Sequence, residues 1–174
     1  MYKRYALWLI SKGDRQTALK YLRAAVSLEP AKTREYIALF ALYGWTDGEI
    51  QGILPSMAMP HLLFADYLDK TGHQDMADEE YRSAIAYIKD ARETGASPYY
   101  QAHGYFMKRE MYDDALTVMR KAGEVLPGDP GIRITLAETY EKAGIPYRAA
   151  EEFRKALVLD PSNSRAKKKL EEMK

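Results

Sequence analysis

Histidine is the side chain best suited to acid–base or metal chemistry at neutral pH, and this chain has three: His61, His73 and His103. Their separations match no spacing typical of metal ligands, so we interpret them as structural or solvated residues. The absence of cysteine excludes a disulfide scaffold and a thiolate zinc site. The glycines are scattered and form no phosphate-binding loop. We therefore expect a chain that is not an enzyme and that holds no cofactor and no metal.

Two pairs of carboxylates offer a second kind of chemistry. Asp66 and Asp69 are three residues apart, as are Glu138 and Glu141. On a helix that spacing places both members of a pair on one face. Paired carboxylates can perform acid–base work, but an exposed, solvated helix face explains the same pattern.

The composition limits the class of protein. The chain has 174 residues and a net charge of +1, from 26 basic and 25 acidic side chains. This balance excludes a strongly basic nucleic-acid binder and an acidic tail protein. With 47% hydrophobic and 29% charged residues, the chain is neither disordered nor membrane-embedded. No stretch approaches the ~20 apolar residues that span a bilayer, so we expect a soluble domain, cytoplasmic or periplasmic. The chain begins within a helical pattern, which suggests a piece of a longer protein.

Large and small apolar residues recur along the chain at intervals near 34 residues, and these repeats must position any site. The clearest copy reads Leu136, Ala137, Tyr140, Gly144, Ala149, Phe153, Ala156 and Pro161. An earlier copy reads Tyr2, Tyr5, Ala6, Leu9, Gly13, Ala18, Leu22, Ala25 and Pro30. Apolar spacing of three and four residues indicates paired amphipathic helices, and the small residues allow close helix packing. No alternating strand pattern is present.

Helix boundaries carry recognisable signals. Ser97-Pro98 and Asp129-Pro130 each resemble a cap followed by a first-turn proline. Thr46 and Glu49 have the spacing of a capping box, and they start a short helix expected from about Asp47 to Leu54. A loop is expected from Pro55 to Pro60. Gly13, Gly72 and Gly144 occupy expected helix ends, and the helix after Gly72 is expected to continue to about Arg92.

The repeat pattern resembles that of the tetratricopeptide repeat family, whose motif is W-x2-L-G-x2-Y, A-x3-F and P over 34 residues. The resemblance implies an all-α, right-handed α-solenoid of about five antiparallel helix pairs and a C-terminal capping helix. It implies one array over 1–174. The expected repeats are 1–30, a short and degenerate 31–57, 58–95, 96–129 and 130–163, with the capping helix at 164–174.

The resemblance also implies a function, namely non-catalytic binding of a protein or peptide along a concave groove lined by the first helix of each pair. The candidate groove residues are Leu7, Ile10, Ile37, Trp45, Leu62, Asp66, Asp69, Tyr100, Met107, Lys108, Ile134, Glu138 and Glu141. The aromatic and methionine side chains would anchor a peptide, and the four carboxylates would favour a basic one. No nucleic acid partner and no membrane insertion are expected.

Three other functions were weighed. Chaperone-binding members of the family use paired Lys and Asn residues, and the single asparagine, Asn163, lies beyond the last repeat, so that function is rejected. The chain resembles the soluble C-terminal repeats of larger bacterial membrane or envelope enzymes, such as O-antigen ligase-like glycan-assembly proteins, and this alternative stays open. The first repeat has no polar helix ahead of it, so Trp8 would be exposed and a structural homodimer through the N-terminal end is a further alternative.

Overall fold

The structure, a computed structural model, describes residues 1–88 and 95–173. Those residues form α-helices and one short 3-10 helix, with no β-strand among them. The all-helical prediction is confirmed. Of the helices described, none combines the length and the apolar character needed to cross a membrane.

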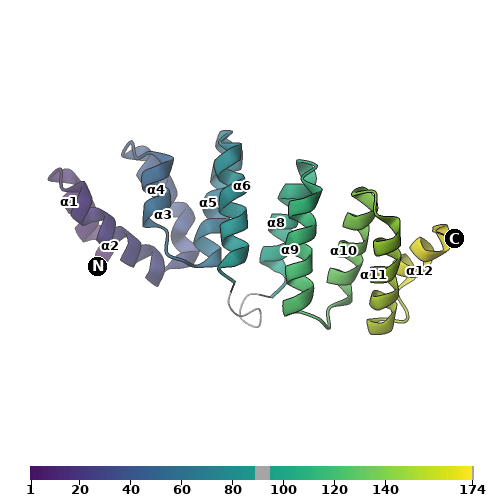
Figure 1. Cartoon of the computed structure of the whole chain (residues 1–174). Coiled ribbons are helices and arrows are strands. Elements are labelled where there is room, and N and C mark those ends of the chain that lie inside the picture. Colours follow the sequence, from purple (N-terminus) through teal and green to yellow (C-terminus); the bar gives the residue numbers. More distant parts are fainter. Residues whose placement is uncertain (89–94, 174) are drawn as a thin grey trace. The chain divides into compact units, whose positions relative to one another are not determined.

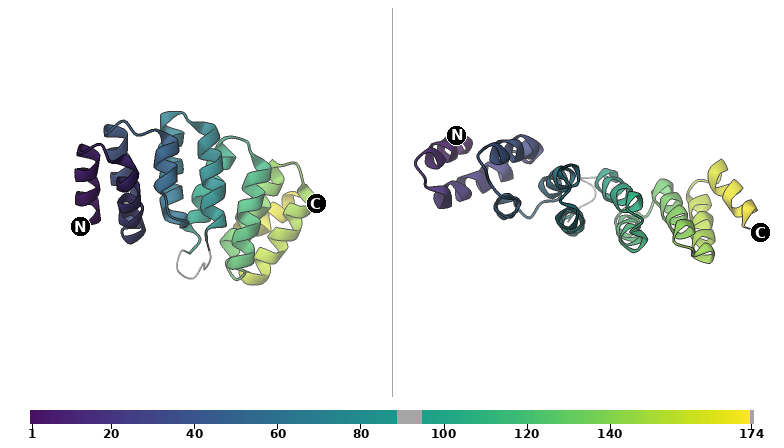
Figure 2. Two further views of the ribbon diagram at one scale, coloured as in Figure 1. Left: turned by 60° about the vertical axis from the view of Figure 1, so that its left-hand side comes forward. Right: turned by 90° about the horizontal axis from the view of Figure 1, so that it is seen from above.

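The chain divides into two compact units, Met1–Ile88 and Lys89–Lys174 (Figure 1). In the first unit α1 (Tyr2–Ser11) packs on α2 (Arg15–Leu28), and α5 (Ala58–Thr71) packs on α6 (Gln74–Ala86). In the second unit α8 (Ser97–Lys108) packs on α9 (Tyr112–Val125), and α10 (Pro130–Lys142) packs on α11 (Pro146–Leu159). The last helix, α12 (Ser164–Glu172), packs on α11. The paired helices α5–α6 and α10–α11 lie side by side (Figure 1), and Figure 2 gives two further views of the ribbon.

The second repeat departs from this arrangement. A short 3-10 helix, η1 (Pro30–Lys32), leads into α3 (Thr33–Leu42), which packs mainly on α5, whereas α4 (Asp47–Ile53) packs mainly on α2. With only seven residues, α4 is too short to form a full hairpin with α3. The unit that the sequence predicted to be short and degenerate therefore differs from the others in its packing. Its two helices pack mainly on different neighbouring helices.

Most of the expected helix boundaries agree with the structure. The Thr46 side chain caps α4 and Glu49 completes the capping box. Asp129 Oδ1 accepts from the backbone N–H groups of Gly131 and Ile132 at the start of α10. Gly72 lies at φ +85°, a left-handed conformation that ends α5 and that a residue without a Cβ adopts at low cost.

Three boundary predictions are wrong. Ser97 is the first residue of α8 rather than its cap, and no side-chain hydrogen bond caps this helix. The loop predicted at 55–60 is shorter, because α5 begins at Ala58 and Pro60 lies in its first turn, where no backbone N–H is needed. The helix α6 ends at Ala86, so Tyr87 and Ile88 do not continue it, and residues 89–92 of the predicted extension lie outside the described residues.

Each unit has its own core of large aromatic and small alanine side chains. Tyr36, Phe40 and Phe64 are fully buried in the first unit, as are Phe106 and Phe153 in the second. The alanines of the repeat pattern are completely buried at the helix–helix contacts: Ala6, Ala18, Ala65, Ala77, Ala84, Ala102, Ala115, Ala122, Ala137, Ala149, Ala156 and Ala166. A methyl group at these positions lets neighbouring backbones approach closely, so the aromatic rings fill the remaining space.

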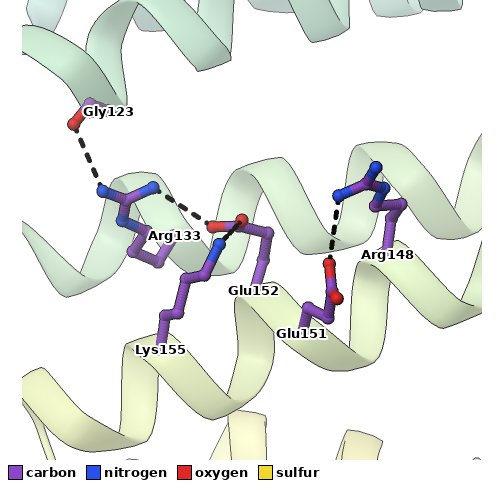
Figure 3. A network of polar contacts seen from close by, with 6 residues as sticks. All are labelled: Gly123, Arg133, Arg148, Glu151, Glu152 and Lys155. Carbon is purple, nitrogen blue, oxygen red and sulfur yellow. Dashed lines mark hydrogen bonds and ion pairs between the residues drawn. The ribbon is translucent and has the colours of Figure 1, made fainter.

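A polar network ties three helices of the second unit together (Figure 3). Arg133 of α10 donates to Glu152 Oε2 of α11 at 3.2 Å and to the backbone carbonyl of Gly123 in α9 at 3.3 Å. Lys155 also donates to Glu152, at 2.6 Å. Glu152 is buried, so its charge is balanced by two cations rather than by water. Gly123 leaves room for this guanidinium, since an added Cβ would lie 3.1 Å from Arg133 Nη1.

Candidate binding surface

The candidate groove residues differ in their access to solvent. Four of them are buried in the cores of their units: Ile37, Trp45, Leu62 and Ile134. Seven are partly buried: Leu7, Ile10, Asp66, Asp69, Met107, Glu138 and Glu141. Tyr100 and Lys108 are exposed. The four buried residues pack helices together in this structure, so a surface ligand would meet the other nine.

Trp45 lies after α3 and acts as a packing residue of the first unit. Its ring centroid is 5.5 Å from that of Phe40, and the Arg15 guanidinium lies over the indole at 5.5 Å. Arg15 also donates to the carbonyl of Tyr43 at 3.1 Å. Trp45 follows the end of α3 at Leu42, so it lies in the α3–α4 turn and not on the helix. There its side chain is enclosed by α2 and by the turn.

The carboxylate of Asp66 in α5 is neutralised within the first unit. It accepts hydrogen bonds from Arg34 of α3 at 3.0 Å and from Lys70 at 2.8 Å. Arg34 and Lys70 are both largely exposed, so these ion pairs are solvent-screened. Asp66 thus offers a local balance of charges to a ligand rather than an uncompensated negative charge.

In the second unit α8 carries Tyr100 and His103 next to two hydrogen-bonded threonines of α10, Thr135 and Thr139. Tyr100 lies against the start of α10, where a Cβ added at Gly131 would be 3.0 Å from the phenol oxygen. His103 Nε2 lies 2.8 Å from Thr139 Oγ1. The Thr139 hydroxyl donates to the Thr135 carbonyl at 2.7 Å, so its oxygen accepts the Nε2–H of His103. This interaction fixes the histidine as the Nε2–H tautomer.

Burial changes the acid–base behaviour of this α8 face. Desolvation lowers the pKa of His103 below its ordinary value of 6.5, which keeps the imidazole neutral. Desolvation likewise raises the pKa of the Tyr100 phenol. Both side chains are therefore uncharged near neutral pH and act as hydrogen-bonding and packing groups.

The acidic rim expected on α10 is neutralised by α12. Arg165 Nε lies 2.5 Å from Glu138 Oε1, and Lys169 Nζ lies 3.1 Å from Glu141 Oε2. These four side chains and Lys142 line a polar hollow of about 440 Å³ between the two helices. The preference of these carboxylates for a basic ligand stays a prediction, and the predicted capping helix supplies counter-charges to Glu138 and Glu141.

A buried polar cluster in the first unit was not recognised from the sequence. His61 Nδ1 lies 2.5 Å from Glu80 Oε2, while Nε2 lies 3.1 Å from the Pro55 carbonyl oxygen. Gln51 donates to the other oxygen of Glu80 at 2.7 Å. One feature of the sequence could have indicated this cluster. Glu80 lies three residues after Ala77 and four before Ala84, which places it on the buried face of α6. The cluster joins α4, α5 and α6, which agrees with a structural role for His61.

The charged groups of the candidate surface are mostly paired with one another. Within the ranges 1–88 and 95–173, no three His, Asp or Glu side chains gather as a metal ion would require. Asp66, Glu138 and Glu141 each form an ion pair with a Lys or Arg side chain.

Comparisons with known proteins agree with this fold. A tetratricopeptide repeat model matches residues 2–32, and the predicted resemblance to that family is confirmed. No curated protein matches the sequence.

Several solved structures share the fold. The C-terminal part of a tetratricopeptide repeat-containing protein from Cytophaga hutchinsonii has 18% identity and a TM-score of 0.55, over 98% of this chain and 69% of that one. PilF from Pseudomonas aeruginosa has 21% identity and a TM-score of 0.51, over 99% and 65%. YrrB, described as a tetratricopeptide repeat protein with an unusual peptide-binding site, has 17% identity and a TM-score of 0.51, over 96% and 89%. At these identities the similarity shows the fold alone, which is in general a scaffold for protein interactions.

Proposed function

We propose that this chain is a non-catalytic scaffold that binds a protein or peptide segment on the first-helix faces of its repeats. The observation that carries the proposal is the exposed aromatic side chain of Tyr100, held on a polar face of the second unit. Tyrosine at such a position has a large contact area and little rotamer entropy to lose, so it is well suited to anchor a ligand.

The surface of the second unit has the features of a peptide site. Tyr100 and Met107 supply apolar contact from α8, and Lys108 is exposed one residue further on. Glu138 and Glu141 lie next to Arg165 and Lys169, so both charge signs are available along the rim. An extended peptide that places an apolar side chain on Tyr100 and Met107 and polar groups along this rim fits such a surface.

In the first unit the proposed contact residues are Leu7 and Ile10 of α1 and Asp66 and Asp69 of α5. All four are partly buried, which leaves part of each side chain for a ligand. YrrB, which has this fold and an unusual peptide-binding site, supports the same kind of function for this chain.

A selection experiment tests the proposal without knowledge of the natural partner. A random peptide library is selected on the immobilised full chain, and the enriched peptides are measured by calorimetry on Tyr100→Ala/Met107→Ala. We expect affinity to fall by ~tenfold or more, as for the loss of hot-spot anchors. Tyr147→Ala is the matched control, since Tyr147 is exposed on α11. Unchanged binding to the double variant, or equal loss in the control, would contradict the proposed surface.

A further inference from the structure

The N-terminal helix pair exposes a cluster of aromatic rings that pack on one another. The Tyr5 and Trp8 rings are stacked with centroids 5.6 Å apart, and Tyr21 of α2 meets Tyr5 edge-on at 4.7 Å. Tyr2 lies 6.1 Å from Tyr21. Trp8 retains 52% of its surface in solvent, and Tyr2 and Tyr5 are similarly exposed. Three adjacent, half-exposed rings form a larger apolar patch than single surface residues do.

The same repeat positions are buried elsewhere in the chain. Tyr2 corresponds in register to Tyr36, which is 1% exposed, against 44% for Tyr2. Tyr5 corresponds to Phe64 and Leu136, which are 0% and 2% exposed, against 43% for Tyr5. In later repeats these positions are covered by neighbouring helices, so the α1–α2 face has the side chains of a helix-packing surface.

The α1–α2 segment that carries this aromatic cluster has an excess of basic side chains. Residues 1–28 contain six basic side chains and one acidic one. The acidic residue, Asp14, accepts a hydrogen bond from the Thr17 backbone N–H as the cap of α2. Arg4, Lys12 and Lys20 are exposed, and no carboxylate in the described part of the chain forms an ion pair with them. The exposed surface of the α1–α2 pair, which carries these three cations and the rings of Tyr2, Tyr5, Trp8 and Tyr21, is called the N-terminal face below.

The other end of the chain shows how such a face is covered. There α12 buries Ala166 against the core formed by α10 and α11, with Leu170 and Met173 packed beside it. Its basic residues Arg165 and Lys169 pair with Glu138 and Glu141 of α10. One helix thus combines an apolar stripe with flanking charges opposite to those of the pair beneath it.

We propose that the N-terminal face is a docking site for an amphipathic α-helix of a protein partner, with an apolar stripe flanked by Asp and Glu residues. This is the arrangement of α12 with the charge signs exchanged: the stripe packs on Tyr5 and Trp8 while the carboxylates pair with Arg4, Lys12 and Lys20. A second copy meeting the same face symmetrically would bring like charges together, which opposes a dimer of that kind.

The test uses the full chain and two designed helical peptides that share one leucine stripe. One peptide carries Glu at the flanking positions and the other carries Lys. Trp8 reports binding, because it is exposed whereas Trp45 is only 5% exposed, and Trp8→Phe provides the signal control. We expect the Glu peptide to shift the Trp8 emission to shorter wavelength and to bind ~tenfold or more tightly than the Lys peptide.

A charge exchange separates docking from a general effect on folding. The triple variant Arg4→Glu/Lys12→Glu/Lys20→Glu should no longer bind the Glu peptide and should bind the Lys peptide. Circular dichroism should confirm that its helicity is unchanged. Tyr147→Ala should behave as the unaltered chain. Equal binding of both peptides, or no reversal in the helical triple variant, would overturn the proposal.

Other occupants are distinguished by further arms of the same experiment. The probes are phosphatidylcholine vesicles with and without phosphatidylglycerol, oligothymidylate, and the chain itself in sedimentation at rising concentration. If one of these shifts the Trp8 emission or changes the sedimentation while the Glu peptide does not bind, the helix proposal is wrong. The peptide library result on Tyr100→Ala/Met107→Ala concerns a different surface, so the two proposals can fail separately.

Discussion

Two neighbouring glutamates of α11 show how burial changes the role of a single charge. Glu152 is buried and holds Arg133 and Lys155, whereas Glu151 pairs with Arg148 in the solvent (Figure 3). We expect Glu152→Gln to lower the free energy of unfolding of the second unit by about 1–3 kcal/mol, because Arg133 loses its buried counter-charge. Glu151→Gln should change it by about 0.5 kcal/mol or less. Urea unfolding of the two variants measures the difference, and equal effects would contradict this interpretation.

His103 should make the stability depend on pH. Its pKa is lowered in the folded chain because burial disfavours the imidazolium, so below pH 6.5 the unfolded chain takes up the proton more readily. The stability contributed by the neutral imidazole is complete above pH 6.5 and is lost as the pH falls through the lower folded pKa. His103→Gln should therefore reduce the fall in Tm between pH values above and below 6.5. If the variant and the unaltered chain lose the same amount, His103 is not the responsible group.

At the scale of the element, the short helix α4 depends on its first turn. Thr46 Oγ1 accepts from the Glu49 backbone N–H at 3.3 Å, and Glu49 Oε2 accepts from the Thr46 backbone N–H at 2.8 Å. Thr46→Ala should cost about 1 kcal/mol, since a seven-residue helix has few other backbone hydrogen bonds. Chemical unfolding gives the value. Thr117→Ala, in the middle of α9, is the matched control and should cause no loss.

The sequence predicted elements better than it predicted which residues face solvent. Periodicity and the Thr46 and Asp129 caps gave the helices, because those signals are local in the chain. The pairing of α3 with α5 and of α4 with α2 was not predictable, since it depends on how short α4 is relative to its neighbours.

The candidate site was harder to predict because side-chain access is a tertiary property. Element boundaries are predicted only to within about 2–4 residues, and Ile37, Leu62 and Ile134 proved to be core residues. The pairing of the α10 carboxylates with α12 was also not predictable. Arg165 lies 27 residues after Glu138, and no local pattern joins the two.

At the scale of the whole molecule, the chain divides into two compact units. We expect the isolated segments 1–88 and 95–174 each to be helical and to unfold cooperatively, because each contains several mutually packed helices. Thermal denaturation followed by circular dichroism tests both. A segment without a cooperative transition would show that its core is insufficient alone.

The fully buried alanines at the helix contacts have a consequence for how this sequence can evolve. Ala77 and Ala149 have no solvent-exposed surface, so a larger side chain there would have to enter the packed interior, and we expect these small residues to tolerate replacement as poorly as the largest rings. In a library of single substitutions, tolerated changes should be confined to exposed positions. The buried alanines should tolerate substitution as poorly as Phe64 or Phe153. Those residues, which carry no chemistry, are the ones by which distant descendants of this chain would still be recognised.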